Sequence, residues 1–463
     1  MGAVGNFNAS LTGIAVNNNL DMRLIRDINS NGVVDSGDEV VRAAAGGNQN
    51  DSINVQSLVA GNYFLQTYLH SGTSSNYTLR MSNTGGSPSN LLGPEVNVGT
   101  LSTTPFSRFS TLSTNNASDT YSFTMGAVGN FNASLTGIAV NHNLDMRLIR
   151  DVNSNGVVDS GDEVIRAAAG GNQNDSINIR SLAAGNYVLQ TYLHSGTSSN
   201  YTLRMSNTGG SPSNLVGPEV NVGTLSTTPF SRFSTLSNNN ASDTYSFTMG
   251  SVGNFNASLT GIAASHDLDM RLIRDVNNNN IVDSGDVLVT STAGGNRDEA
   301  INVRSLAAGN YLLQTYLYSG TSSSYTLRMS NTGNSGGSPS NLLPIETSIG
   351  TIGSPITRSG SVGVNNASDT FRFSMASSRR VTLNLIGLSA DADLRLIRDA
   401  NNNGIVDAGE VIGRSSASGT SNERLSMSLT GGVSYIAQVY FYSSTGSTSY
   451  NLGIAPSIIP FPF

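Results

Sequence analysis

The chain repeats itself, and this repetition constrains its fold more than any other feature. Residues 1–124 align without a gap with residues 125–248, and nine positions differ between the two copies. A third unit begins at Met249 and diverges more, and a fourth begins near Met375 and diverges most. Self-similarity at a fixed period indicates an array of similar structural units.

Each copy predicts a succession of short strands separated by turn residues. Alternating patterns such as Tyr121/Phe123/Met125 give a strand one apolar face, and no stretch has the periodicity of a helix. In the second copy we place strands at 119–125, 130–138, 144–150, 163–167, 176–182, 187–194 and 201–205, with one or two more within 220–236. Such a series predicts an all-β chain, a tandem array of four jelly-roll-like β-sandwich domains.

Segments rich in glycine, serine, asparagine and proline separate the copies. They lie around 83–94, 207–218 and 331–344, and their composition is typical of connectors between domains. We therefore predict four domains, with the boundaries 1–90, 91–214, 215–341 and 342–463.

A twelve-residue segment with regularly spaced oxygen side chains recurs once in each copy. In the second copy, Asp151 to Asp162 has such side chains at positions 1, 3, 5, 9 and 12 and a glycine at position 6. This is the spacing of an EF-hand-type calcium loop, in which position 7 adds a backbone carbonyl. The third copy has Asn280 at position 6, the residue that best replaces glycine at a positive φ angle. The predicted calcium ligands are Asp27, Asn29, Asn31, Val33, Asp35, Asp38, Asp151, Asn153, Asn155, Val157, Asp159, Asp162, Asp275, Asn277, Asn279, Ile281, Asp283, Asp286, Asp399, Asn401, Asn403, Ile405, Asp407 and Glu410.

The flanks of this loop do not have the length or periodicity of helices, so the loop joins two strands. A calcium sensor opens a pair of helices, and that mechanism is absent from such a hairpin. Calcium is therefore interpreted as a structural clip. Because position 12 is aspartate in three copies, we expect weak sites, with dissociation constants of roughly 10⁻⁴ to 10⁻³ M.

Composition removes other ways of stabilising an extracellular β-protein. The chain has no cysteine, and all 24 basic residues are arginine, so disulfides and lysine isopeptide bonds are excluded. The formal charge is −7, and no stretch of basic residues is present, so we do not expect nucleic acid as a partner. No apolar run is long enough to span a membrane. We expect an extracellular, secreted or cell-surface protein whose leader is removed or lies outside this sequence, because residues 1–6 do not form a signal peptide.

Four motifs, in order, resemble the bacterial pre-peptidase C-terminal domain. They are Ser118 to Phe123, Leu144 to Asp151, Leu182 to Tyr187 and Tyr201 to Leu203, and the third is the most specific. The resemblance covers essentially the whole chain as four copies. It implies a jelly-roll-like β-sandwich of secreted proteins, often appended to proteases or surface proteins, with roles in secretion, substrate or matrix binding and sometimes calcium binding. The inserted loop is similar to the calcium loop of dockerins, without the dockerin helices.

The first copy lacks a strand with which the other copies begin, because Met1 aligns with Met125 at the end of that strand. An unpaired edge of this kind is a template for a strand from elsewhere. Either another chain supplies the strand, which gives a head-to-tail filament, or the N-terminus is a truncation. The uncharged tail 454–463 is one candidate segment, although Pro460 and Pro462 would restrict it to an edge position.

No constellation of catalytic residues is repeated, so we expect no enzyme activity. His70 and His194 share one position, which is tyrosine in the later copies, and are expected to be exposed strand-end residues, as His142 and His266 are expected in turns. Asp145 and its equivalents Asp21, Asp269 and Asp393 are expected to pair with a neighbouring arginine on a strand surface; the alternative is that they are outer-sphere partners of the calcium loop.

The leading interpretation is a calcium-stabilised structural or adhesive repeat protein that binds copies of itself in a filament. The alternative is a secreted array of modules, accessory to an enzyme, that binds a polysaccharide or a matrix protein. In that case Tyr63, Tyr68 and Tyr77 and their counterparts would form an aromatic platform, although alternation assigns some of them to the core.

Overall fold

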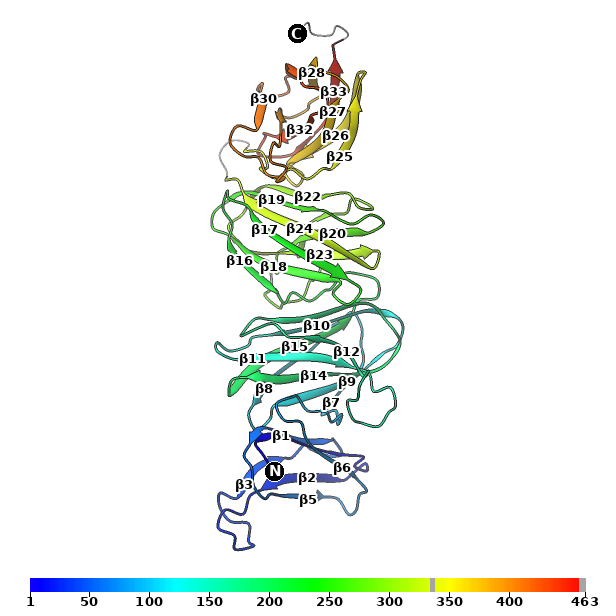
Figure 1. Ribbon diagram of the computed structural model, residues 1–463, viewed down its shortest axis with the longest axis vertical. Coiled ribbons are helices and arrows are strands. Elements are labelled where there is room, and N and C mark those ends of the chain that lie inside the picture. Colours follow the sequence, from blue (N-terminus) through cyan, green and yellow to red (C-terminus); the bar gives the residue numbers. More distant parts are fainter. Residues whose placement is uncertain (334–337, 458–463) are drawn as a thin grey trace. The chain divides into compact units, whose positions relative to one another are not determined.

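The computed structural model describes residues 1–333 and 338–457, and this part of the chain contains strands and no helix. The all-β prediction is confirmed. The chain divides into two compact units, Met1–Glu219 and Val220–Phe463. The first unit contains the strands of the first two copies and the second unit those of the last two (Figure 1).

The strands lie close to their predicted positions. The first copy has β1 (Gly5–Thr12), β2 (Asn19–Ile25), β3 (Glu39–Ala43), β4 (Asp51–Leu58), β5 (Phe64–Ser71) and β6 (Thr78–Asn83). The second copy has β7 (Val96–Thr100), β8 (Phe106–Ser113), β9 (Ser118–Met125), β10 (Gly129–Thr136), β11 (Asn143–Ile149), β12 (Glu163–Ala167), β13 (Asp175–Leu182), β14 (Gly185–Ser195) and β15 (Ser198–Asn207).

The second unit repeats this order twice. The third copy has β16 (Val220–Thr224), β17 (Phe230–Ser237), β18 (Ser242–Met249), β19 (Gly253–Thr260), β20 (Asp267–Ile273), β21 (Val287–Ser291), β22 (Glu299–Leu306), β23 (Gly309–Ser319) and β24 (Ser322–Asn331). The fourth copy has β25 (Thr347–Ile352), β26 (Ile356–Gly363), β27 (Ser368–Met375), β28 (Arg379–Ile386), β29 (Ala392–Ile397), β30 (Val411–Ser415), β31 (Glu423–Leu429), β32 (Ser434–Phe441) and β33 (Ser447–Pro456). The end of the predicted apolar tail, 458–463, lies outside the described residues, as do residues 334–337 of the third connector.

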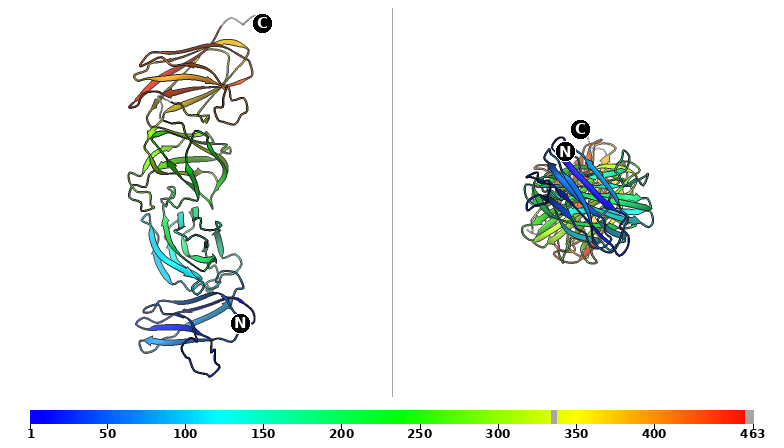
Figure 2. Two further views of the ribbon diagram at one scale, coloured as in Figure 1. Left: turned by 90° about the vertical axis from the view of Figure 1, so that its left-hand side faces the viewer. Right: turned by 90° about the horizontal axis from the view of Figure 1, so that it is seen from below.

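Each of the last three copies contains one four-stranded and one five-stranded sheet. In the second copy the strand orders are β13-β10-β15-β8 and β12-β11-β14-β9-β7. Neighbouring strands are antiparallel, except that β7 runs parallel to β9, as β16 does to β18 and β25 to β27. Figure 2 shows the strand layers from two further directions.

Aromatic and aliphatic side chains of both sheets fill one core in each copy. In the second copy, Phe123 of β9 stacks on Phe131 of β10 with ring centroids 5.0 Å apart, and on Tyr187 of β14 at 5.8 Å. Phe131 belongs to the four-stranded sheet, while the other two rings belong to the five-stranded sheet. The two sheets therefore pack face to face, and the apolar positions of the alternating patterns form this core.

The first copy has six strands, in the sheets β4-β1-β6 and β3-β2-β5. It lacks counterparts of β7, β8 and β9, which is three strands rather than the one we predicted. Side chains that face the core in the second copy are exposed here: Tyr77 and Met81 are 48% and 58% exposed, whereas Tyr201 and Met205 are 0% exposed. Within the described residues, β5 and β6 are the edge strands of these two sheets.

Candidate metal centre

The four predicted calcium loops connect the two antiparallel strands of a hairpin. In the second copy the loop lies between β11 and β12, which pair from Met146 opposite Ala167 to Ile149 opposite Glu163. The other copies use the equivalent pairs, β2 with β3, β20 with β21 and β29 with β30. The prediction that strands flank the loop is confirmed.

Hydrogen bonds bring positions 1, 3, 5 and 9 of the loop together. The carboxylate of Asp151 accepts hydrogen bonds from the backbone nitrogens of Asn155, at 3.1 Å, and Gly156, at 2.8 Å. The amide groups of Asn153 and Asn155 donate to one oxygen of Asp159, at 3.0 and 2.7 Å. The equivalent bonds occur in the other three copies, so these side chains converge in every loop.

The residue at position 12 is buried and binds backbone nitrogens of the loop. Asp162 is buried, and its two carboxylate oxygens accept hydrogen bonds from the backbone nitrogens of Val152, at 3.1 Å, and Asp159, at 2.9 Å. Glu410, the glutamate at this position in the fourth copy, accepts the same two bonds from Ala400 and Asp407, at 2.8 and 2.9 Å. Aspartate and glutamate therefore fill the same place.

Position 6 has the predicted backbone conformation. Gly156 has a φ angle of +75°, and Asn280, which replaces glycine in the third copy, has a φ angle of +58°. A second residue with positive φ lies at position 4, where Ser154 has a φ angle of +57°. We did not predict this second residue; serine or asparagine at that position in all four copies was the available signal.

In the first three copies, hydrogen bonding favours the ionised form of the acidic residue at position 9. Hydrogen bonds from Asn153 and, to a lesser extent, Asn155 lower the pKa of Asp159, and the same pair of bonds lowers the pKa of Asp35 and of Asp283. A hard cation needs an ionised carboxylate. The side chains at positions 3, 5 and 9 are thus joined by hydrogen bonds, whereas those at positions 1 and 12 bind backbone nitrogens of the loop. All five carry oxygen atoms, the ligand type that calcium prefers.

Each loop of the second and fourth copies also binds the connector that precedes its copy. Leu91 and Val157 form an isolated antiparallel bridge, and Leu92 donates a backbone hydrogen bond of 2.9 Å to Gly156. In the second unit, Leu342 bridges Ile405, and Leu343 donates a bond of 2.9 Å to Gly404. Position 7 of the loop, whose carbonyl we predicted to be a ligand, therefore also pairs with the connector.

An arginine on the strand before the loop fixes the same connector. Arg147 is buried and donates hydrogen bonds to the carbonyl oxygen of Ser89, at 2.7 Å, and to Gln190, at 2.8 Å. Arg395 in the fourth copy donates equivalent bonds to Ser340, at 2.6 Å, and to Gln438. Burial lowers the pKa of both arginines. The sequence signal for this docking was the pair of leucines in these two connectors, Leu91-Leu92 and Leu342-Leu343.

The aspartates of the strand before the loop do not form surface pairs with arginine. Asp21, Asp145, Asp269 and Asp393 are all buried, so that prediction is wrong. Each of these strands has neighbours on both sides in its sheet. In the second copy the connector also covers the side chain of Arg147, on the same strand as Asp145. His70 and His194 are exposed, as predicted, and each places Nδ1 3.3 Å from a carboxylate oxygen, of Asp21 and Asp145 respectively.

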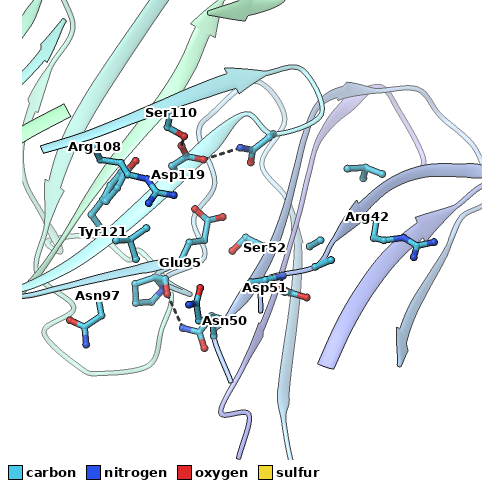
Figure 3. A pocket seen from close by; sticks show the side chains of 18 of the residues that line it. Arg42, Asn50, Asp51, Ser52, Glu95, Asn97, Arg108, Ser110, Asp119 and Tyr121 are labelled. Atoms are coloured by element: carbon cyan, nitrogen blue, oxygen red, sulfur yellow. Dashed lines mark hydrogen bonds between the residues drawn. The ribbon is translucent and has the colours of Figure 1, made fainter. Parts of the chain in front are cut away.

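The predicted aromatic platform is absent from the second copy, where Tyr187, Tyr192 and Tyr201 are all buried. A polar groove of about 1000 Å³ lies instead within the first unit, between strands of the first and second copies (Figure 3). Arg42, Asn50, Asn97 and Arg108 are among the side chains that line it. Among the described residues, no helix has the length and apolar character needed to cross a membrane.

Comparison with known proteins gives likenesses at low coverage. No protein-family model and no curated protein matches the chain. Among solved structures, the pre-peptidase C-terminal domain of a collagenase from Bacillus anthracis is 21% identical, with 25% of this chain and 99% of that chain covered and a TM-score of 0.20. PliG of Aeromonas hydrophila, a periplasmic inhibitor of g-type lysozyme, is 18% identical, with 24% and 96% covered and a TM-score of 0.18. The chain is therefore similar, over about a quarter of its length, to a pre-peptidase C-terminal domain.

Proposed function

We propose that this chain is an extracellular, non-enzymatic repeat protein with a structural or adhesive role, built from four jelly-roll-like β-sandwich domains that calcium stabilises. The observation that carries the proposal is the docking of the connector on the loop. Val158 donates a backbone hydrogen bond of 2.7 Å to Asn90, and Val406 donates one of 2.8 Å to Asn341. An ion that orders the loop thereby also orders the junction with the preceding copy.

In the second copy, Asp151, Asn153, Asn155, Asp159 and Asp162 would hold the ion, together with the carbonyl of Val157. The ion would supply a positive charge that balances the carboxylates of the loop. The amide groups of Asn153 and Asn155, which donate to Asp159, would present their oxygens to the ion as ligands. At calcium about a hundredfold above the dissociation constant, each occupied site adds roughly 2.7 kcal/mol to folding.

The open edges of the first copy are the proposed site of assembly. Strands that pair with β5 and β6 come from a second copy of the chain in a head-to-tail filament, or from residues that precede Met1 in a longer chain. Exposed core positions such as Tyr77 and Met81 favour such a covering segment, because soluble proteins rarely leave contiguous apolar surface uncovered.

Electron microscopy of the chain in millimolar calcium, and again after chelation, tests this function. We expect filaments in calcium that disperse in chelator. The matched variant carries residues 91–124 joined in front of Met1, which restores the three strands. If this variant assembles as well as the parent chain, strand complementation is wrong; if neither responds to calcium, the role of the ion is wrong.

The alternative is an array that binds a polysaccharide or a matrix protein, and the polar groove favours it. Arginine and asparagine side chains at its wall can bind hydroxyl and carboxylate groups of a glycan. Screening the chain against a glycan array tests this alternative. Binding that Arg108→Ala and Asn97→Ala abolish would support it, and an absence of binding would leave the structural role.

A further inference from the structure

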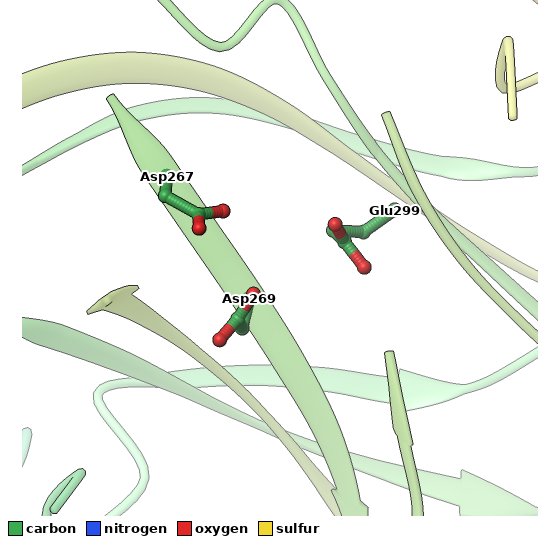
Figure 4. A group of neighbouring side chains, drawn as sticks. All are labelled: Asp267, Asp269 and Glu299. Carbon is green, nitrogen blue, oxygen red and sulfur yellow. The ribbon is translucent and has the colours of Figure 1, made fainter. Parts of the chain in front are cut away.

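Three carboxylates meet inside the third copy, away from the calcium loop. Asp267 and Asp269 lie on β20, in the five-stranded sheet, and Glu299 begins β22, in the four-stranded sheet (Figure 4). Each offers an oxygen, and these three oxygens lie within 4.8 Å of one another. All three residues are buried. The cluster lies at the start of β20, whereas the loop follows the end of that strand.

One carboxylate oxygen of this cluster has no partner among the described residues. Oδ1 of Asp267 is buried and accepts no hydrogen bond. The carboxylate of Glu299 is held in place by the backbone nitrogen of Ala293, at 2.7 Å, and by the hydroxyl of Ser291. A buried anionic oxygen without a donor is costly, and two neighbouring carboxylates increase that cost unless a cation is present.

Residues of the same kind occupy the equivalent positions in the other copies, although among the described residues only the three carboxylates of the third copy meet within 4.8 Å. The equivalent residues are Asn19, Asp21 and Asp51 in the first copy, Asn143, Asp145 and Asp175 in the second, and Asp391, Asp393 and Glu423 in the fourth. In the first and second copies, all three residues are buried, and each has one side-chain oxygen without a hydrogen-bond donor in the part of the chain that the structure describes. In the fourth copy, one buried oxygen of Asp391 and one of Glu423 likewise have no hydrogen-bond donor among the described residues. Oxygens at equivalent positions thus remain unpaired in every copy.

We propose that the third copy contains a second cation site, in which Asp267, Asp269 and Glu299 bind a calcium ion between the two sheets, and that the equivalent residues of the first and second copies form the same site. All the ligand atoms are oxygens, which hard cations prefer. Calcium binds oxygens at 2.3–2.6 Å, so two of its ligands can lie up to about 5 Å apart, whereas magnesium needs a tighter octahedron at about 2.0–2.1 Å. The separations in this cluster therefore suit the larger ion. The ion would neutralise the cluster and join the two sheets, a role that does not depend on the loop.

Calcium titration of the full chain, with the number of bound ions determined by equilibrium dialysis, tests the proposal. The variant Asp267→Asn with Glu299→Gln should bind one ion fewer than the parent chain. The loop variant Asp275→Ala with Asp283→Ala should lose a different ion, and the combined variant should lose two. If the cluster variant keeps the full number of ions, the second site is wrong. If the loop variant keeps the full number of ions while the cluster variant loses one, the proposed loop site is wrong and the proposed cluster site is supported.

Two single substitutions separate ion binding from folding. Asp267→Asn introduces the residue that the first and second copies already have at this position, so the fold should accept it. It should weaken the binding of one ion and, in chelator, raise the melting temperature of the third copy because repulsion is reduced. The converse change, Asn143→Asp, should tighten one site in the second copy. A lower melting temperature in chelator for Asp267→Asn, with unchanged ion binding, would show that the carboxylate serves only as a structural hydrogen-bond acceptor.

Discussion

The backbone nitrogen of Leu92 lies 2.9 Å from the carbonyl oxygen of Gly156, so the connector from the first copy is hydrogen-bonded to the loop of the second. Leu343 and Gly404 repeat this relationship at the same distance in the second unit. The connector binds the loop through backbone atoms, while the side chains of the loop converge on its interior. Order in the loop and order in the connector are therefore coupled.

Removing loop ligands should destabilise the second copy mainly when calcium is present. Asp151→Ala with Asp159→Ala should remove up to about 2.7 kcal/mol of stabilisation at calcium a hundredfold above the dissociation constant. Differential scanning calorimetry in calcium and in chelator measures the change. Ser160→Ala, at position 10 of the same loop, is the control and should have little effect. An equal loss of stability in both conditions would contradict a calcium site in the loop.

The arginine that binds the connector, Arg147, should contribute more to the free energy of unfolding than its counterpart in the first copy, Arg23. Arg147 is buried and bonded to Ser89, whereas Arg23 is partly exposed and bonded to Gln66 at 2.7 Å. Arg147→Ala should cost about 3–5 kcal/mol because it leaves buried partners unpaired. Arg23→Ala should cost about 0–1 kcal/mol. Chemical denaturation provides these free energies.

Hydrogen exchange measures the effect of Arg147 on the hydrogen bonds between the connector and the loop. In Arg147→Ala, the amides of Leu92 and Val158 should exchange faster, because their hydrogen bonds tie the connector to the loop. The corresponding amides in the fourth copy, of Leu343 and Val406, serve as an internal control. Unchanged protection at Leu92 would show that Arg147 does not hold the connector.

Met205 and Met81 occupy equivalent positions in two nearly identical copies, and replacing them should have very different effects on the free energy of unfolding. Met205→Ala should cost about 2–5 kcal/mol, because it removes a fully buried side chain. Met81→Ala should change the free energy of unfolding of the separate chain by less than about 0.5 kcal/mol, since Met81 lies on an open edge. Urea denaturation measures both. If strands from another chain cover this edge, Met81→Ala should also reduce filament formation, and intact assembly would contradict that covering.

Buried carboxyl groups should make the chain less stable at higher pH when calcium is absent. Burial and the neighbouring Asp369 raise the pKa of Glu346 above its usual 4.5, and Thr370 donates a backbone bond of 2.7 Å to it. Above pH 4.5 the folded chain retains a proton that the unfolded chain releases, so this contribution is full below pH 4.5 and falls as pH rises. Urea denaturation in chelator from pH 5 to 8 should show the decline.

The variant Glu346→Gln tests the assignment of that pH dependence. The free energy of unfolding of this variant should fall less with rising pH than that of the parent chain, because the group that retains the proton has been removed. Glu39→Gln is a suitable control, since hydrogen bonding to Arg42 lowers the pKa of Glu39. Its contribution to stability is complete above pH 4.5, so this variant should keep the slope of the parent chain between pH 5 and 8. An unchanged slope in Glu346→Gln would exclude Glu346 as a source.

Much of the fold follows from local patterns in the sequence. Alternation placed strands such as 144–150 to within a residue or two of β11, and the glycine or asparagine at position 6 predicted a positive φ angle. These features depend on neighbours in the chain. Alternation also assigned Asp145 and Arg147 to a polar surface, and there it was wrong. Their burial depends on a connector and on strands far away in sequence, which a local pattern does not encode.

The first loop differs from the others in one respect. Val33 and Val34 are 58% and 43% exposed, whereas their counterparts Val157 and Val158 are half-buried against the connector. Docking of a connector and binding of an ion must each favour the other by the same free energy. The loop of the second copy should therefore fill at lower calcium than the chemically matching loop of the first, and the array should respond to calcium over a graded range of concentrations.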